Sequence, residues 1–336
     1  MALPPKVLIQ SAKFIWTTMW KTMMQSLAPG DRSGAYQRPD SQFRHQIMVP
    51  TNAEAQPNYI AQADRYYLYV GYGCPWAHRT LVMLALKGLE SVIGVRVAVP
   101  SPDQGIWKLE TPSESCQTVP ELYQLANPGY QGRSTVPILW DNQTKTIVNN
   151  ESSDILQILN SAFNAFAQYP DRDFYPEALQ STIDEWNDKI YHAVNNGVYR
   201  CGFAQTQTAY NQACRELFDM LDTLDAVLAT QRYVCGDRLT LTDVRLFTTL
   251  FRFDVVYYSL FKCSRQRIAD YPNLGPYLRD LYQIPGVAAT CHLEAVKQDY
   301  YGNLFPLNPG GIIPETPQVT QLDSPHDRDR FLPSLG

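Results

Sequence analysis

One cysteine, Cys74, stands between an apolar run and a helix-like pattern in the stretch YVGYGCPWAHRT, residues 69–80. Pro75 suits the first turn of a helix, where no backbone donor is needed, so Cys74 is predicted to lie at a helix N-terminus. Free backbone N–H groups there stabilise a thiolate, and the pKa of such a thiol is expected to fall. The placement indicates a reactive nucleophile rather than a buried small apolar residue.

The position that would hold a resolving cysteine is occupied by Ala77. A dithiol oxidoreductase uses a second thiol there to release its own mixed disulfide. Without it, an adduct on Cys74 has to be released by an external thiol through thiol–disulfide exchange. We therefore expect a thiol cosubstrate, and glutathione is the abundant candidate. GYGCPW does not match GxGxxG, because Trp76 takes the last position, so no dinucleotide site is indicated.

The other cysteines and the histidines indicate neither a metal site nor a disulfide framework. The chain has seven cysteines, an odd number without CxxC pairs, and five histidines without ligand spacing. This pattern predicts a reducing, cytoplasmic setting and no bound metal. We interpret His78 and Arg79, which follow the nucleophile, as solvated helix residues.

Length, composition and charge limit the class of protein. The 336 residues suggest two domains, and 45% hydrophobic with 18% charged residues is ordinary for a globular protein. The formal net charge is −5 and no Lys/Arg-rich run occurs, which argues against a nucleic-acid partner. No run of about 18 apolar residues is present, so we expect no transmembrane segment.

Local patterns around Cys74 predict the elements that position it. A strand is expected at 66–70, a helix from Pro75 to the stop signal Lys87-Gly88, and a parallel strand within 92–99. The two glycines before the cysteine, Gly71 and Gly73, are expected to let the turn bend sharply.

A second group of elements follows a loop-rich stretch at 100–132. Strands are expected at 136–140 and 146–148, then a helix capped by Ser152 or Ser153. The order β-α-β and then β-β-α is that of a thioredoxin-like α/β domain, which we place at residues 61–165.

Helical periodicity dominates from about residue 177. A long helix near 209–229 has its apolar face at Cys214, Leu217, Leu221, Leu224 and Leu228. Thr240 and Asp243 have the spacing of a helix capping box, with Leu239 and Val244 as a hydrophobic staple. We expect an all-α domain at 176–302 and a proline-rich tail at 303–336 that forms an extended strap or is partly disordered.

The first 60 residues are assigned to an N-terminal arm. One helix face would carry the apolar residues Leu8, Ala12, Trp16, Met19, Met23 and Leu27. Lysines occur in this segment and no acidic residue precedes Asp31. The pattern fits an organelle transit peptide, a membrane-surface helix, or an arm that packs on its own protein or on a partner subunit.

Ordered motifs give the chain a specific resemblance. CPWAHRT, TVPILW and NNESSDI occur in this order, and the likeness extends from YQRPDSQFR near residue 36 to NPGGIIPETP. The chain resembles the xi-class glutathione transferases, the glutathionyl-hydroquinone reductases. The resemblance implies a thioredoxin-like glutathione-binding domain, an all-helical domain with an acceptor site, and a homodimer.

The resemblance also implies roles for individual residues near glutathione. Val136 and a cis Pro137 would pair with the cysteinyl part of glutathione, while Glu151 and Ser152, at a helix start, would hold its γ-glutamyl end. Trp107 and Arg133 match family positions near the same ligand. A loop-anchoring tryptophan, a surface arginine and simple helix capping are the structural alternatives.

Two tyrosines would face the acceptor. By resemblance, Tyr199 and Tyr300 would line the aromatic site, where a phenol hydroxyl can hydrogen-bond the quinol oxygen. The chain departs from the family pattern beside them, because DYYGN replaces a histidine-rich segment and puts Asp299 next to Tyr300.

The implied reaction is the glutathione-dependent reduction of an S-glutathionyl-hydroquinone, with Cys74 as the nucleophile and oxidised glutathione as a product. Two other functions stay open. One is a general monothiol transferase that acts on mixed disulfides or dehydroascorbate, as omega-class relatives do. The other is a non-catalytic protein that binds aromatic ligands, for which Cys74 would be dispensable.

Overall fold

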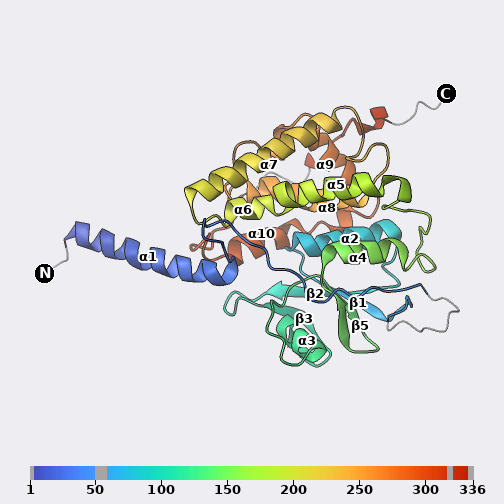
Figure 1. The fold of residues 1–336 in the computed structure, drawn as a ribbon, viewed down its shortest axis with the longest axis horizontal. Coiled ribbons are helices and arrows are strands. Elements are labelled where there is room, and N and C mark those ends of the chain that lie inside the picture. Colours follow the sequence, from blue (N-terminus) through green and yellow to red (C-terminus); the bar gives the residue numbers. More distant parts are fainter. Residues whose placement is uncertain (1–3, 50–58, 316–320, 332–336) are drawn as a thin grey trace.

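The computed structural model describes residues 4–49, 59–315 and 321–331. Figure 1 shows a mixed sheet at one end of the molecule, a layer formed by helices α2 and α4 on one of its faces, and the remaining C-terminal helices beyond that layer. Helix α3 covers the opposite face of the sheet, and helix α1 projects from the body. A thioredoxin-like domain is therefore followed by a helical domain, as the sequence predicts.

The sheet has six strands in the order β4-β3-β2-β1-β5-β6. Their bounds are Tyr66–Val70 (β1), Gly94–Pro100 (β2), Trp107–Ser113 (β3), Cys116–Thr118 (β4), Ile138–Asp141 (β5) and Thr146–Asn149 (β6). Strands β1 and β2 pair in parallel, with Leu68 opposite Val95, and the other neighbours pair antiparallel. The parallel pair confirms the strand–helix–strand unit around Cys74.

The helices of the thioredoxin-like domain are α2 (Pro75–Lys87), α3 (Val119–Ala126) and α4 (Ser152–Ser161). Helix α2 ends at Gly88, which adopts the left-handed conformation with φ 62° and donates to the carbonyls of Ala85 and Leu84. The cap of α4 is Glu151, whose carboxylate accepts from the backbone of Ser153, so the predicted serine caps are wrong. The carboxylate serves as well as a hydroxyl because it accepts the same orphan backbone N–H.

The stretch 100–132 is not mainly loop, as the sequence interpretation had it. It contains β3, β4 and α3; β4 is an edge strand of the sheet and β3 lies next to it. Strand β3 is partly exposed and polar, so it lacks the apolar alternation of a half-buried strand. A usable signal was present for α3, because Thr118 and Glu121 form a complete capping box.

The helical domain contains α5 (Gln180–Ile190), α6 (Gly197–Gly202), α7 (Gln207–Leu228), α8 (Leu241–Arg252), α9 (Leu274–Gln283) and α10 (Leu293–Asn303). The four leucines predicted on the inner face of α7 are fully buried. The predicted capping box at the start of α8 is confirmed, with Asp243 accepting from the Thr240 backbone at 2.8 Å. A π-helical turn, Phe253–Tyr257, follows α8 and had no signal in the sequence interpretation.

Both terminal regions contact the body of the molecule. Near the N-terminus, the backbone of His45 donates to the Val148 carbonyl at 3.0 Å, so this segment runs beside β6. In the tail, the buried guanidinium of Arg328 donates to the carbonyls of Leu228, Gln231 and Arg232, at the C-terminal end of α7. The tail therefore caps a helix of the second domain.

Candidate active site

Cys74 lies at the N-terminus of α2, on the residue that precedes its first turn. Its Sγ donates to the carbonyl oxygen of Val136 at 3.4 Å, and the Val136–Pro137 peptide bond is cis. Trp107 lies against the preceding turn, since its ring packs on Gly71. The structure thus brings the predicted nucleophile together with three residues that the sequence interpretation assigned to the glutathione site.

The pKa of Cys74 does not fall as the helix N-terminus predicts. The thiol is surrounded by protein atoms, and this burial raises its pKa above the ordinary value. The backbone N–H groups of Ala77 and Trp76 and the charges of Arg252 and Arg38 act in the opposite direction without overcoming it. The helix N-terminus therefore does not by itself lower the pKa of Cys74 below its ordinary value.

Alkylation of Cys74 by iodoacetamide tests the direction of this pKa shift. Because burial raises the pKa of the thiol, the thiolate fraction and the rate constant are expected to rise about tenfold per pH unit from neutral to alkaline pH. Mass spectrometry of the Cys74 peptide, with the Cys74→Ser protein as background, gives the rate. A rate that is already independent of pH near neutrality contradicts the expectation.

Gly71 and Gly73 are needed for close approach rather than for a special backbone angle. Neither has a positive φ, so the predicted sharp bend is not the reason for glycine here. A Cβ on Gly71 would lie 2.4 Å from the Trp107 ring, and one on Gly73 would lie 2.2 Å from the Asp299 carboxylate. Asp299 accepts a hydrogen bond from the backbone N–H of Gly73 at 3.0 Å. This residue, where the chain departs from the family pattern, thus holds the turn that carries Cys74.

Arg252, at the end of α8, holds the same turn from the helical domain. Its buried guanidinium donates to the carbonyls of Tyr72 at 2.9 Å and Gly73 at 3.0 Å. It also donates to Nδ1 of His78 at 2.9 Å, which leaves Nε2 of that ring to donate to the Thr290 hydroxyl. The sequence interpretation missed Arg252 because nothing near it in the sequence indicates where its side chain lies.

His78 and Arg79 are buried, at 1% exposure each, so their interpretation as solvated residues is wrong. The side of α2 that carries them packs against other helices instead of water. Burial and the nearby charge of Arg252 hold the pKa of His78 well below its ordinary value, and the imidazole is neutral. It therefore adds no positive charge beside Cys74.

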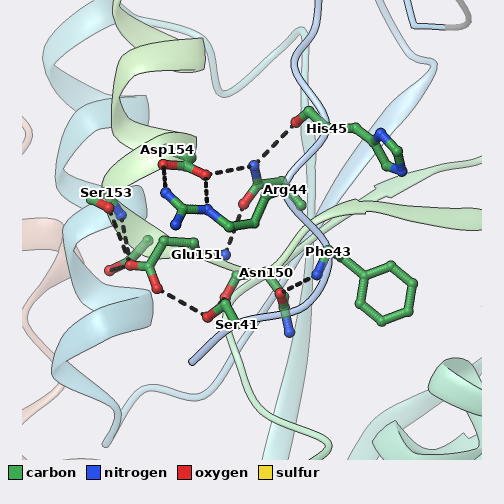
Figure 2. A network of polar contacts seen from close by, with 10 residues as sticks. Ser41, Phe43, Arg44, His45, Asn150, Glu151, Ser153 and Asp154 are labelled. Carbon is green, nitrogen blue, oxygen red and sulfur yellow. Dashed lines mark hydrogen bonds and ion pairs between the residues drawn. The ribbon is translucent and has the colours of Figure 1, made fainter. Parts of the chain in front are cut away.

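The N-terminus of α4 forms a polar site that includes the arm. Figure 2 shows Ser41 pointing at Glu151, and its hydroxyl donates to the carboxylate at 2.9 Å. Glu151 also accepts from the backbone and hydroxyl of Ser153, at 3.1 and 3.2 Å. In the same network, Arg44 makes a two-pronged ion pair with Asp154. Ser41 and Arg44 were missed because more than 100 residues separate them from their partners.

Positive charge gathers around Glu151. Burial raises the pKa of this carboxyl, but the hydrogen bonds from Ser153 and Ser41 and the charges of Arg38 and Arg79 outweigh burial and lower it. Arg79 donates to the Ser152 hydroxyl at 3.3 Å. The guanidinium groups of Arg38 and Arg79 lie 3.9 and 4.4 Å from the centre of the Trp76 ring.

Two buried guanidinium groups in this region have a donor atom without a hydrogen-bond partner among the described residues. Arg245 is close enough to Arg79 to lower its pKa further, and Glu151 is the carboxylate that acts on both. The Nε atoms of Arg79 and Arg245 are buried and have no hydrogen-bond partner among the described residues. The site can therefore accept an additional anionic group.

Three tyrosine hydroxyls meet near Cys74. The Tyr300 hydroxyl lies 2.5 Å from that of Tyr199 and 3.0 Å from that of Tyr257. Burial raises the pKa of each phenol above its ordinary value, so all three are protonated. Tyr301 points elsewhere and donates to the Val255 carbonyl at 3.1 Å. Tyr257 was missed because no motif distinguishes it among 21 tyrosines.

For the side chain of Arg133, the structure shows no hydrogen bond or ion pair with the other predicted site residues among the described residues. Its side chain is exposed, three residues before Val136, and its carbonyl accepts from the Tyr130 hydroxyl at 3.1 Å. Its assignment to glutathione stays a prediction. Within the part of the chain that the structure describes, no three His, Cys, Asp or Glu side chains are placed to hold a metal ion.

Two family models match the chain. Residues 73–162 match "Glutathione S-transferase, N-terminal domain", and residues 207–280 match "Glutathione S-transferase, C-terminal domain". Glutathionyl-hydroquinone reductase YqjG of Escherichia coli is 45% identical, over 88% of this chain and 93% of its own length. Glutathionyl-hydroquinone reductase PcpF of Sphingobium chlorophenolicum is 42% identical, over 90% of this chain and 94% of its own.

Solved structures of glutathione transferases are also similar to this chain. The glutathione-bound structure of YqjG superposes with a TM-score of 0.80 at 43% identity and covers 86% of this chain and 96% of its own. The xi glutathione-S-transferase of Phanerochaete chrysosporium superposes with a TM-score of 0.81 at 42% identity and covers 85% and 94%.

Proposed function

Because the chain belongs to the xi-class glutathione transferases, we propose that it reduces S-glutathionyl-hydroquinones, with glutathione as the cosubstrate. The observation that carries the proposal is that Cys74 lies near two kinds of site. One is the anion-accepting site at the start of α4, whose Arg38 acts on both Glu151 and Cys74, and the other is the cluster of protonated phenols.

The first step breaks the carbon–sulfur bond of the conjugate. The Cys74 thiolate attacks the glutathione sulfur, the electron pair of the carbon–sulfur bond stays with the ring carbon, and a proton completes the hydroquinone. The product on the enzyme is a mixed disulfide between Cys74 and glutathione. The tyrosine cluster is suited to hydrogen-bond the quinol oxygens and to assist this proton transfer.

The second step restores the thiol. A second glutathione, as its thiolate, attacks the glutathione sulfur of the mixed disulfide and leaves as oxidised glutathione. Since Ala77 replaces a resolving cysteine, no internal thiol of α2 competes with this attack. Overall, one conjugate and one glutathione give one hydroquinone and one oxidised glutathione.

The residues around Cys74 suit glutathione. The Val136 carbonyl and backbone can pair with the cysteinyl part, and Glu151 can accept from the γ-glutamyl amine. The Ser152 region, where the buried Nε atoms of Arg79 and Arg245 have no hydrogen-bond partner among the described residues, favours the γ-glutamyl carboxylate. Arg133 and Trp107 are proposed to lie against the same ligand.

The experiment compares two substrates. With glutathione present, release of hydroquinone from a glutathionyl-hydroquinone should far exceed the turnover of a small glutathione mixed disulfide. Faster turnover of the mixed disulfide would favour a general monothiol transferase instead. Equal amounts of hydroquinone and oxidised glutathione are expected, and unequal amounts would contradict the two-step mechanism.

Replacing Tyr300 with phenylalanine should slow the reduction selectively. Its hydroxyl joins those of Tyr199 and Tyr257, so its loss removes a proton-transfer group that contributes about 10²-fold. The kcat on glutathionyl-hydroquinone should fall by that factor, while turnover of a small mixed disulfide stays nearly unchanged. Tyr301→Phe, on the next residue of α10, is the matched control, and an equal loss in both variants would argue against a role for the cluster.

The same proposal covers assembly and location. We propose a homodimer that works in the cytoplasm, as the reducing cysteine pattern suggests. In the described residues, no helix combines the length and apolar character needed to cross a bilayer.

A further inference from the structure

Helix α1 (Pro5–Leu27) is joined to the body at one end and projects from it along most of its length (Figure 1). Its C-terminal end is fixed, because Met24 and the following Ala28 are fully buried. One further contact is the tilted packing of the Trp16 ring on Phe305, with ring centres 6.5 Å apart. The helix is thus part of the folded protein, but its outer turns lack a core of their own.

Large apolar side chains remain exposed on this helix. Leu8, Ile15 and Met19 are 58%, 56% and 49% exposed, and Trp16 is 43% exposed despite its contact with Phe305. With Ala12 and Met23 they recur at intervals of three and four residues, so they share one face. A continuous apolar face of this kind indicates a surface that is covered in use.

The charge of α1 is opposite to that of the rest of the chain. Lys6, Lys13 and Lys21 are exposed, and the helix has no aspartate or glutamate. Since the whole chain has a formal net charge of −5, the remainder carries −8 without these three lysines. Helical spacing puts the lysines on one stripe away from this face, together with Gln10 and Thr17, while the exposed Val7 and Phe14 lie beside the stripe.

We propose that α1 is a membrane-surface helix that binds anionic lipid, with its apolar face in the headgroup and acyl boundary and its lysines toward the phosphates. Lysines on the polar face and tryptophan and aliphatic residues on the other are the pattern of helices that lie in this interface. Attraction to anionic lipid explains why a chain that is otherwise acidic keeps this helix free of carboxylates. The lysine-bearing face prevents the helix from spanning the bilayer, in agreement with its hydropathy.

Flotation of the full-length protein with lipid vesicles tests the proposal. We expect binding to vesicles of phosphatidylcholine mixed with phosphatidylglycerol, and much weaker binding to phosphatidylcholine alone. Changing Lys6, Lys13 and Lys21 to glutamine should weaken binding about fivefold per lysine. Ile15→Asn with Met19→Asn should weaken it about tenfold or more, because each change removes apolar area from the lipid contact.

The matched control is Gln10→Asn with Thr17→Asn, two exposed positions on the lysine stripe, which should leave vesicle binding unchanged. Turnover in solution, without vesicles, should be unaffected in every variant and shows that each is folded. Sedimentation velocity tests the alternative, in which a second copy of the chain covers the apolar face of α1. The lipid proposal is wrong if the protein binds neither kind of vesicle. It is also wrong if the changes at Ile15 and Met19 alter the oligomeric state instead of vesicle binding.

Discussion

Replacing Cys74 with serine is expected to reduce the turnover of glutathionyl-hydroquinone by at least about 10³-fold. The hydroxyl of serine is a poor nucleophile toward sulfur, and it cannot form the mixed disulfide from which glutathione is released. The fold should survive, because Cys74 makes only one side-chain hydrogen bond, to the Val136 carbonyl, among the described residues. Assays of hydroquinone release in the presence of glutathione measure the effect.

A single-turnover experiment sharpens this test. Wild-type protein mixed with conjugate and no free glutathione should release one hydroquinone per active site and retain one glutathionyl group on Cys74, seen by mass spectrometry. Cys214→Ser, at a partly exposed thiol of α7, should behave as the wild type. Turnover that persists in the Cys74→Ser protein would exclude the covalent mechanism and favour a binding function.

Replacing Arg252 with methionine is expected to lower both stability and turnover. The guanidinium is fully buried and donates to the Tyr72 and Gly73 carbonyls, so its loss leaves these acceptors unpaired between the two domains. Unpaired buried groups of this kind cost about 1–3 kcal/mol each, and we expect the free energy of unfolding to fall by about 3 kcal/mol. Chemical denaturation followed by circular dichroism gives this value.

The catalytic part of the effect has its own readout. Arg252 lowers the pKa of Cys74, so without it the alkylation profile of the thiol should move to higher pH in the protein that remains folded. Arg215→Met, at an exposed position of α7, removes the same charge without these contacts and should change neither property. An unchanged alkylation profile in the Arg252→Met protein would limit Arg252 to a structural role.

The local features of the active site could be predicted from sequence because they depend on neighbouring residues. Pro75 after Cys74 specifies a helix start, and Gly88 specifies its end. The capping box of α8 is equally local, because its hydroxyl and carboxylate lie three residues apart. These signals were enough to place the nucleophile.

The missed groups depend on contacts between distant segments. Ser41 reaches Glu151 across 110 residues, and Arg252 reaches Gly73 across 179, so no window of sequence contains both partners. The prediction that the pKa of Cys74 is lowered was wrong for the same reason. A helix N-terminus is visible in the sequence, whereas the burial that opposes it is produced by packing of the whole domain.

The end of α7 shows how late in synthesis the helical domain can be completed. The carbonyl of Leu228, its last residue, accepts from Arg328 across 100 residues, and the carbonyls of Gln231 and Arg232 just beyond the helix accept from the same side chain. At the usual rate of translation, α7 leaves the ribosome about 5–20 s before that arginine does. During this interval the end of the helix has to rely on water or on another binding protein. The end of α7 is therefore expected to stay accessible to proteases and chaperones until Arg328 has been synthesised.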